Sequence, residues 1–325
     1  MITPLISVVI PVYKSAESLE ELALRLTSSL SSITNDFEVI LVNDGSPDNS
    51  WEIISKISDS DPRFVGVRLS RNFGQHPAIS AGLRISGGTW VVVMDCDLQD
   101  RPEEIPKLYE KTKEGFEQVV AIRNSRQDPW FKKKSASAYV GILSYLSGRH
   151  INPSVGNFGI YHRCVIDVVT SLKEQGRTFG LLVLWAGFRR AELEVEHAQR
   201  PYGKSSYSYR ALLRLGLLGI ISHSDKPLKL TIKFGLYLST ASLAGGCWII
   251  GRQIIWGHAM IGWSSVMVSI AFMTGILLGS IGIAGSYIAQ IFDEVKERPT
   301  SVTWQTTGGR NAGVSYPNKW DKNAN

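Results

Sequence analysis

Two long stretches in the second half of this 325-residue chain contain no charged side chain. They cover 234–251 and 253–292, and the second is too long for one crossing of a bilayer. It divides at GHAMIGWSS, a polar turn that contains glycine. Because an apolar stretch of about 18 residues or more can span hydrocarbon, we expect two transmembrane helices, near 233–255 and 264–290. The alternative is a buried helical hairpin in a large soluble core.

Basic residues flank the outer ends of these stretches, namely Lys226, Lys229, Lys233, Lys296 and Arg298. The connection between the two stretches carries only Arg252. Since loops rich in lysine and arginine stay on the cytoplasmic side, both termini are expected in the cytoplasm. The pattern therefore predicts a multi-pass protein of the cytoplasmic (inner) membrane.

The first two hundred residues alternate between apolar runs and stretches with helical spacing. Strands are expected over 5–13, 37–46, 64–70 and 90–97, and helices over 15–30, 49–60 and 76–86. This alternation is typical of a parallel sheet with helices on both faces. No G-x-G-x-x-G follows the first strand and no Walker A sequence is present, which disfavours a dinucleotide dehydrogenase or a P-loop NTPase.

Two of the predicted strands end in acidic residues, Asp44 after FEVILVN and the pair Asp95 and Asp97 after WVVVM. Ligands of such sheets bind beyond the carboxyl ends of the strands, so these carboxylates are expected to share one crevice. Clustered negative charge needs a positive partner, and Mg²⁺ is usually held by one or two carboxylates together with substrate phosphates. We therefore expect Mg²⁺ or Mn²⁺ carrying a diphosphate at Asp95 and Asp97, with Gln99 as a further oxygen ligand.

Several segments together carry a family resemblance: SVVIPVYKSAESL, VILVNDGSPDNS, RNFGQHPAISAGL, VVVMDCDLQDRPEEIPKL, RNSRQDPWFKK and QRPYGKSSYS. In order and spacing the chain resembles family 2 glycosyltransferases, and within them the polyisoprenyl-phosphate glycosyltransferases. The resemblance implies an α/β fold, with a Rossmann-like GT-A nucleotide-sugar transferase domain over 1–206. It further implies an interfacial helix over 207–232, two transmembrane helices over 233–292 and a cytoplasmic tail over 293–325. That tail is expected to be flexible or to add one strand.

The resemblance also implies roles for individual residues. The nucleoside pocket would be lined by Pro11, Tyr13 and Asp44. The metal that bridges the donor diphosphate would be held by Asp95, Asp97 and Gln99. Phosphates of the donor or acceptor would be met by Arg123, Arg200 and Ser205, which suits arginine because its guanidinium binds phosphate in a bidentate manner. The donor is therefore expected to be a nucleoside-diphosphate sugar.

Asn157 marks a departure from the family pattern, because relatives carry Gly-Asp-Phe where this chain has Gly-Asn-Phe. An amide cannot act as a general base. A polyprenyl phosphate acceptor needs little deprotonation, because the second pKa of a phosphate monoester is about 6. Asn157 is therefore expected to orient the acceptor phosphate, and Asp97, Arg123 and Asn157 form the expected catalytic set. The alternative is that Asn157 is a structural turn residue.

The net charge of +6 fits a nucleic acid, a membrane surface or an anionic substrate. Lys132, Lys133 and Lys134 open an amphipathic stretch, which predicts contact with anionic membrane lipid. The resemblance implies inverting transfer of a sugar from the nucleotide donor to polyprenyl phosphate, without a nucleic-acid partner and with homo-oligomerisation left open. Two alternatives are a processive polysaccharide synthase and a non-catalytic membrane scaffold that kept the fold.

Overall fold

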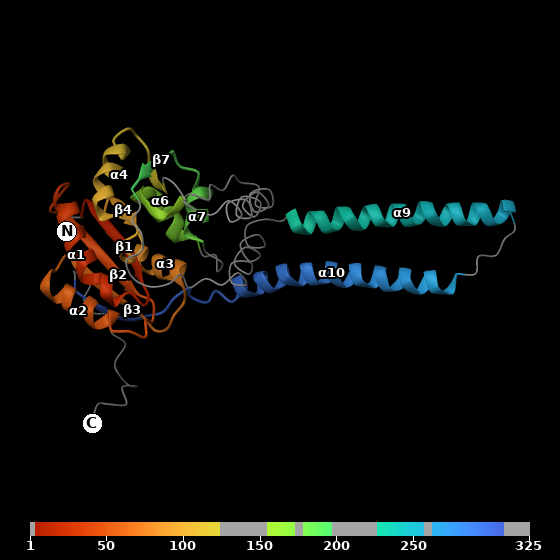
Figure 1. Cartoon of the computed structure of the whole chain (residues 1–325), viewed down its shortest axis with the longest axis horizontal. Coiled ribbons are helices and arrows are strands. Elements are labelled where there is room, and N and C mark those ends of the chain that lie inside the picture. Colours follow the sequence, from red (N-terminus) through yellow and green to blue (C-terminus); the bar gives the residue numbers. More distant parts are fainter. Residues whose placement is uncertain (1–3, 124–154, 173–177, 197–225, 257–261, 309–325) are drawn as a thin grey trace, which may run out of the picture. The chain divides into compact units, whose positions relative to one another are not determined.

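The computed structural model describes residues 4–123, 155–172, 178–196, 226–256 and 262–308 (Figure 1). The described residues divide into two compact units. The first, called the sheet unit below, holds the described residues up to 196 together with 298–308. The second, called the helical unit, holds 226–256 and 262–297.

The sheet unit is built on eight strands in the order β7-β5-β6-β4-β1-β2-β3-β8. Their bounds are β1 Ile6–Val12, β2 Phe37–Asn43, β3 Phe64–Leu69, β4 Trp90–Val93, β5 Gln118–Arg123, β6 Val155–His162, β7 Arg190–Val195 and β8 Thr303–Thr307. The four predicted strands, β1 to β4, pair in parallel as expected. The sheet as a whole is mixed, because β6 is antiparallel to β4 and β5, and β8 is antiparallel to β3.

Helices cover both faces of this sheet. Their bounds are α1 Leu19–Ser31, α2 Ser50–Ser60, α3 Gln75–Ile85, α4 Ile105–Thr112, α6 Arg163–Ser171 and α7 Phe179–Ala186. One apolar core lies between the sheet and α1, α2 and α4, and a second lies between the sheet and α3, α6 and α7. Strand β1 supplies both cores, since Val8 and Ile10 face the first and Val9 faces the second. This alternation follows from the two-residue period of a strand.

Close packing of α3 on the sheet depends on Gly82. A Cβ atom at this position would lie 2.5 Å from Cγ1 of Val9. The absence of a side chain therefore lets α3 approach β1 closely, and α3 begins at the edge of the sheet where the acidic residues lie.

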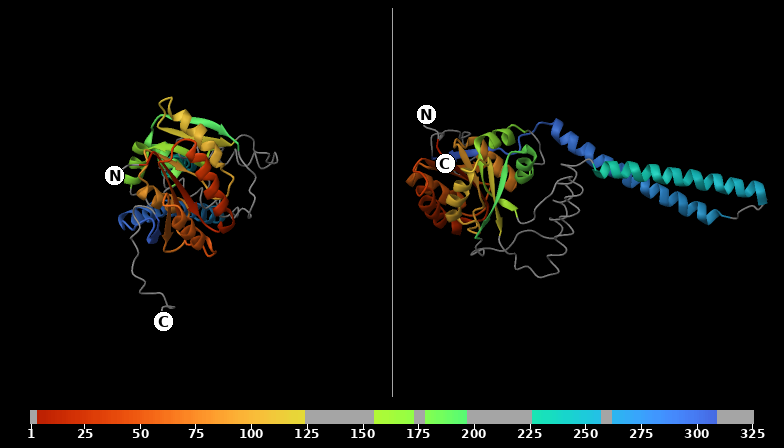
Figure 2. Two further views of the ribbon diagram at one scale, coloured as in Figure 1. Left: turned by 90° about the vertical axis from the view of Figure 1, so that its left-hand side faces the viewer. Right: turned by 90° about the horizontal axis from the view of Figure 1, so that it is seen from above.

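The helical unit contains α9 (Lys226–Trp256) and α10 (Trp263–Val295), each an uninterrupted helix (Figure 2). Among the described residues, one segment is long and apolar enough to cross a membrane. That segment is Phe272–Val295 in α10, with a mean hydropathy of 1.6 and none of its window buried. Two helices thus form where two transmembrane helices were expected, but among the described residues only α10 contains a segment that meets the criterion for a span.

The segment that follows α10 contributes β8 to the sheet unit. Gly66 of β3 pairs with Thr307 of β8, and the backbone N–H of Ser70 donates to the carbonyl of Val302 at 2.9 Å. Of the two expectations for this tail, the added strand is the one found. The chain therefore leaves the sheet unit after β7, forms the helical unit and returns to complete the sheet.

Candidate functional site

The carboxyl ends of β1, β2 and β4 meet at one edge of the sheet, because β1 lies between the other two and all three are parallel. Asp44 directly follows β2, and Asp95 and Asp97 follow β4. Pro11 lies near the end of β1, and Tyr13 follows that strand with an exposed ring. The sheet therefore brings these predicted site residues to a common edge, as the sequence indicated.

The segment after β4 directs its acidic side chains to one side. Asp95 and Asp97 are half-buried, whereas the intervening Cys96 and the following Leu98 are buried in the core. Leu98 has a φ of 61°, a left-handed conformation that is costly for a residue with a branched side chain. The buried leucine and the hydrogen bond from the Gln99 N–H to Oδ1 of Asp97, 3.1 Å long, hold this turn. Backbone strain of this kind persists where the surrounding structure over-determines it, and it clusters at functional sites.

Asp95 has two hydrogen bonds that restrict its position. Nε2 of Gln75 donates to its Oδ1 at 2.6 Å, and its own N–H donates to Oδ2 of Asp100 at 3.2 Å. Asp100 is buried, and its carboxylate accepts this backbone hydrogen bond inside the turn. The partly exposed polar side chains of this segment are therefore Asp95, Asp97 and Gln99, all of them half-buried.

This donor set suits a hard divalent cation. No group of three or more His, Cys, Asp or Glu side chains with the arrangement of a metal site occurs among the described residues. Two carboxylates and one amide oxygen are too few to fill the coordination sphere of such an ion. Mg²⁺ is characteristically bound through one or two carboxylates, with waters and substrate phosphates as the other ligands. Asp95, Asp97 and Gln99 therefore fit an ion that is shared with a phosphate-bearing substrate.

The carboxylate of Asp44 is engaged with a neighbouring loop. Oδ1 accepts the N–H of Phe73 at 2.7 Å, and Oδ2 accepts the N–H of Gly74 at 2.8 Å. The side chain is only 3% exposed; its burial raises the pKa of Asp44, and the two backbone hydrogen bonds act against that rise. The observed partner of Asp44 is thus the loop between β3 and α3. Contact with a nucleoside stays a prediction for this residue.

Asn157 and Arg123 reach the same edge from the other half of the sheet. The last pair of the β4–β6 ladder is Val93 with Gly159, so Asn157, two residues before Gly159 on the antiparallel strand β6, lies beyond this pair toward the carboxyl end of β4. Asn157 is half-buried. Arg123 is the last residue of β5, which runs parallel to β4 because both are antiparallel to β6. The remaining predicted residues, Arg200, Ser205, Lys132, Lys133 and Lys134, lie outside the described residues.

The motif RNFGQHPAISAGL contains Gln75 and His76, for which the sequence predicts no role. Gln75 is the first residue of α3 and contacts Asp95. Nδ1 of His76 accepts the N–H of Phe179 at 3.4 Å, and burial lowers the pKa of His76 to about 4, so its ring is neutral near pH 7. The position of Gln75 could have indicated this contact, because Gln75 directly follows the loop at the carboxyl end of β3, the same edge as the acidic residues.

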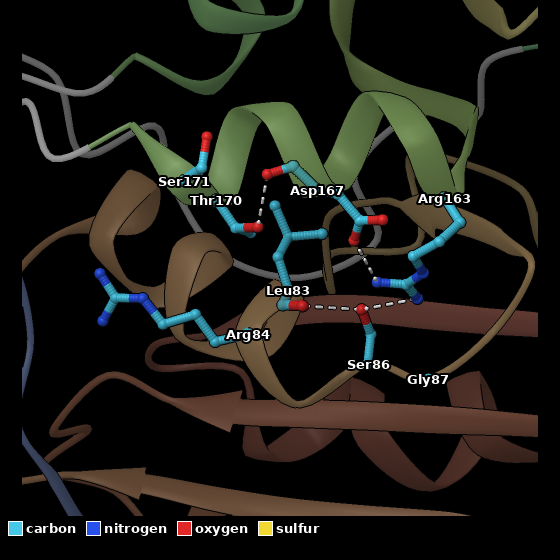
Figure 3. Close-up of a pocket in the computed structure, with 8 residues that line it drawn as sticks. All are labelled: Leu83, Arg84, Ser86, Gly87, Arg163, Asp167, Thr170 and Ser171. Atoms are coloured by element: carbon cyan, nitrogen blue, oxygen red, sulfur yellow. Dashed lines mark hydrogen bonds and ion pairs between the residues drawn. The ribbon is translucent and has the colours of Figure 1, made fainter.

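A pocket of about 590 Å³ lies elsewhere on the sheet unit, between the end of α3 and α6 (Figure 3). Arg163 donates to the carbonyl of Gly88 at 2.6 Å and lies 3.9 Å from Asp167. Gly88 precedes β4 and Asp95 follows it, so this pocket lies at the opposite end of that strand from the acidic edge. It is separate from the candidate site.

Comparison with known proteins identifies the family. Residues 7–168 match the domain described as glycosyl transferase family 2. An uncharacterised glycosyltransferase, YkcC of Bacillus subtilis, is 35% identical over 306 residues, covering 94% of this chain and 95% of its own. The undecaprenyl-phosphate 4-deoxy-4-formamido-L-arabinose transferase of Proteus mirabilis is 33% identical over 97% of this chain and 96% of its own.

A third relative is the prophage-derived bactoprenol glucosyl transferase of Shigella flexneri, 34% identical over 90% of this chain and 96% of its own. Each of the three alignments extends well beyond the family domain, so the similarity includes the region that forms the helical unit. The resemblance inferred from the sequence motifs is confirmed, and the mixed α/β sheet is the GT-A-like fold expected from it. The chain belongs to glycosyltransferase family 2 and is a glycosyltransferase.

Proposed function

We propose that this protein transfers a sugar from a nucleoside-diphosphate sugar to a polyprenyl phosphate at the membrane. The observation that carries the proposal is the placement of Asp95 and Asp97 at the carboxyl end of β4, on the same edge as Asn157. Relatives whose names specify undecaprenyl phosphate or bactoprenol align over at least 90% of this chain. That extent supports a lipid-linked acceptor.

The donor would lie across the edge formed by β1, β2 and β4, with Pro11, Tyr13 and Asp44 toward its nucleoside. Asp95, Asp97 and Gln99 would hold Mg²⁺ or Mn²⁺ beside its diphosphate. When bound, such an ion would counter the charge that builds on the diphosphate leaving group. Arg123, together with Arg200 and Ser205, would contact phosphate oxygens, for which guanidinium groups are well suited.

Asn157 would orient the acceptor phosphate by donating a hydrogen bond from its amide. The acceptor is largely anionic near neutral pH, because its second pKa is about 6, so no enzyme base is required. Its oxygen would attack the anomeric carbon on the face opposite the diphosphate. The bond from that carbon to the diphosphate breaks as the new carbon–oxygen bond forms, and the configuration inverts.

The pairing of β8 with β3 supports an even number of membrane crossings. A strand cannot hydrogen-bond to a sheet on the other side of a bilayer, and β8 follows α10 in the chain. If α10 crosses the membrane, the chain must cross once more between β7 and β8, and α9 is a helix of 31 residues in that interval. We therefore propose that α9 and α10 both span the inner membrane, with the sheet unit and both termini in the cytoplasm.

Transfer of radiolabel tests the function directly. Membranes containing the protein would be incubated with undecaprenyl phosphate and a panel of labelled nucleotide sugars. We expect label in an organic-extractable lipid for one donor. Labelled polymer would indicate a processive polysaccharide synthase, and no product with any donor would favour a non-catalytic scaffold.

Reporter fusions test the topology. A reporter fused after residue 325 should behave as cytoplasmic, and one inserted near residue 258 as external. The opposite pattern would overturn the proposed orientation.

A further inference from the structure

The side chain of Gln75 donates a short hydrogen bond to the carboxylate of Asp95. Its Nε2 lies 2.6 Å from Oδ1 of Asp95, and both side chains are half-buried. A neutral amide can fix the direction of a carboxylate without cancelling its charge. A lysine in the same place would compensate the charge and compete with a cation, whereas a glutamate would repel Asp95.

The position of Gln75 is itself fixed by the loop between β3 and α3. The two oxygens of Asp44 accept the N–H groups of Phe73 and Gly74, the two residues that precede Gln75. Gly74 has a φ of 101°, a conformation that other residues rarely adopt. At the other end of this loop, Ser70 is hydrogen-bonded to Val302, directly before β8. The loop is thus held at both ends.

The loop also passes close to the start of the next segment. A Cβ atom on Gly45, which follows Asp44, would lie 2.5 Å from the carbonyl carbon of Arg71. The end of β2 and the β3–α3 loop are therefore packed backbone against backbone. A shift of the Asp44 carboxylate must move the loop, and a shift of the loop must move Gln75.

We propose that Gln75 is a positioning residue that orients Asp95 for a divalent cation, and that Asp44 acts on Asp95 through the β3–α3 loop and Gln75. This inference rests on the proposed metal-dependent function. Partners that orient ligating carboxylates in this way typically contribute 10- to 100-fold to metal affinity. The role goes beyond the nucleoside contact expected for Asp44 from the sequence.

The first experiment measures Mn²⁺ binding to the full-length protein in detergent, from the electron paramagnetic resonance signal of free Mn²⁺. Gln75→Met keeps the length of the side chain and removes the donor. Gln118→Met is the matched control, because Gln118 is buried in the same unit and donates to the carbonyl of Phe188, at the start of β5 and away from the acidic edge. We expect Gln75→Met to weaken Mn²⁺ binding by about 10-fold or more, and Gln118→Met to leave it within about 2-fold even if it lowers Tm.

The outcomes separate this inference from the proposed function. If the parent binds Mn²⁺, Asp97→Asn abolishes that binding and Gln75→Met does not weaken it, the positioning role is overturned while the metal site stands. If the parent shows no Mn²⁺ binding that depends on Asp97, either alone or with UDP added to supply the diphosphate, the metal assignment fails and this inference fails with it.

The second experiment tests the path from Asp44. Asp44→Asn replaces one acceptor oxygen by an NH₂ group, so one of the two backbone N–H groups loses its partner. We expect weaker Mn²⁺ binding in the absence of nucleotide, and no additional loss when Asp44→Asn is combined with Gln75→Met, because both changes act on the same contact. Normal Mn²⁺ binding by Asp44→Asn with weakened binding of UDP would overturn the path through Gln75 and place Asp44 at the nucleoside.

Discussion

The two units of this protein differ in the burial of their apolar side chains. In the sheet unit, Val9, Ile40 and Val92 are completely buried between sheet and helices. In the helical unit, Trp248 is 71% exposed and Ile254 79% exposed. A water-soluble fold removes such groups from water because burial of apolar surface stabilises it. The sheet unit therefore supplies its own core, whereas the helical unit leaves large apolar side chains exposed, as the proposed membrane crossing would require.

The largest effect that would sharpen this comparison concerns stability. Leu26 of α1 is fully buried and Leu277 of α10 is 60% exposed. Leu26→Ala should destabilise the sheet unit by about 2–5 kcal/mol, the usual result of deleting a core side chain. Leu277→Ala is the matched change and should alter the unfolding free energy in detergent by less than about 0.5 kcal/mol. Equal losses in chemical denaturation would mean that α10 has a protein-covered face.

The next largest effect concerns the rate of sugar transfer by the sheet unit, as distinct from its stability. Asp97→Ala should lower the rate of transfer by about 100-fold or more, because metal stabilisation of charge is worth several kcal/mol. Asp59→Ala, on the exposed surface of α2, is the control and should retain the parent rate. Addition of excess EDTA should reproduce the loss in the parent. Full activity in EDTA would remove the metal from the mechanism.

A smaller effect is expected at Asn157. Asn157→Ala should weaken use of the acceptor by about 1–3 kcal/mol, the usual cost of losing a partner to a charged group. Asn157→Asp should remain active, because the family pattern implied by the sequence resemblance has aspartate at this position. Between about pH 6.5 and 8 the parent rate should show no titrating enzyme base, since the acceptor phosphate ionises with a pKa of about 6. If Asn157→Ala leaves the acceptor KM and the transfer rate unchanged, Asn157 has only a structural role.

The smallest effect per residue concerns the membrane surface. Each basic residue near an anionic membrane contributes about 1 kcal/mol to attraction. Replacement of Lys132, Lys133 and Lys134 by glutamine should raise the KM for polyprenyl phosphate and leave the KM for the nucleotide sugar near its parent value. A parallel rise in both constants would move these lysines from the lipid surface to the donor site.

The parts of the fold that could be predicted are those encoded by local patterns. The apolar runs before Asp44 and Asp95 indicated β2 and β4, and the order of alternating strands and helices placed both carboxylates at one edge. The uncharged stretches likewise indicated α9 and α10. Each single strand, helix or uncharged stretch is encoded in about forty consecutive residues or fewer, where periodicity and charge can be counted.

The parts that could not be predicted depend on pairings between distant residues. Nothing in the local pattern of 155–162 or 303–307 specifies that β6 and β8 run antiparallel to their neighbours. The partner of Asp44 is a loop about thirty residues further along, and the partner of Asp95 is an amide twenty residues before it. Such contacts are set by tertiary packing, which local propensity does not determine.

The return of the chain to form β8 has a consequence for the order of folding. The outer edge of β3 is complete only when residues beyond α10 have been synthesised, since Gly66 pairs with Thr307. Until then β3 offers unpaired backbone groups, which are a template for aggregation. Domains generally begin to fold during synthesis, starting from the N-terminus. The last strand therefore makes completion of the sheet depend on synthesis of the two helices that precede it, so a nascent chain arrested before β8 would carry an open, association-prone edge.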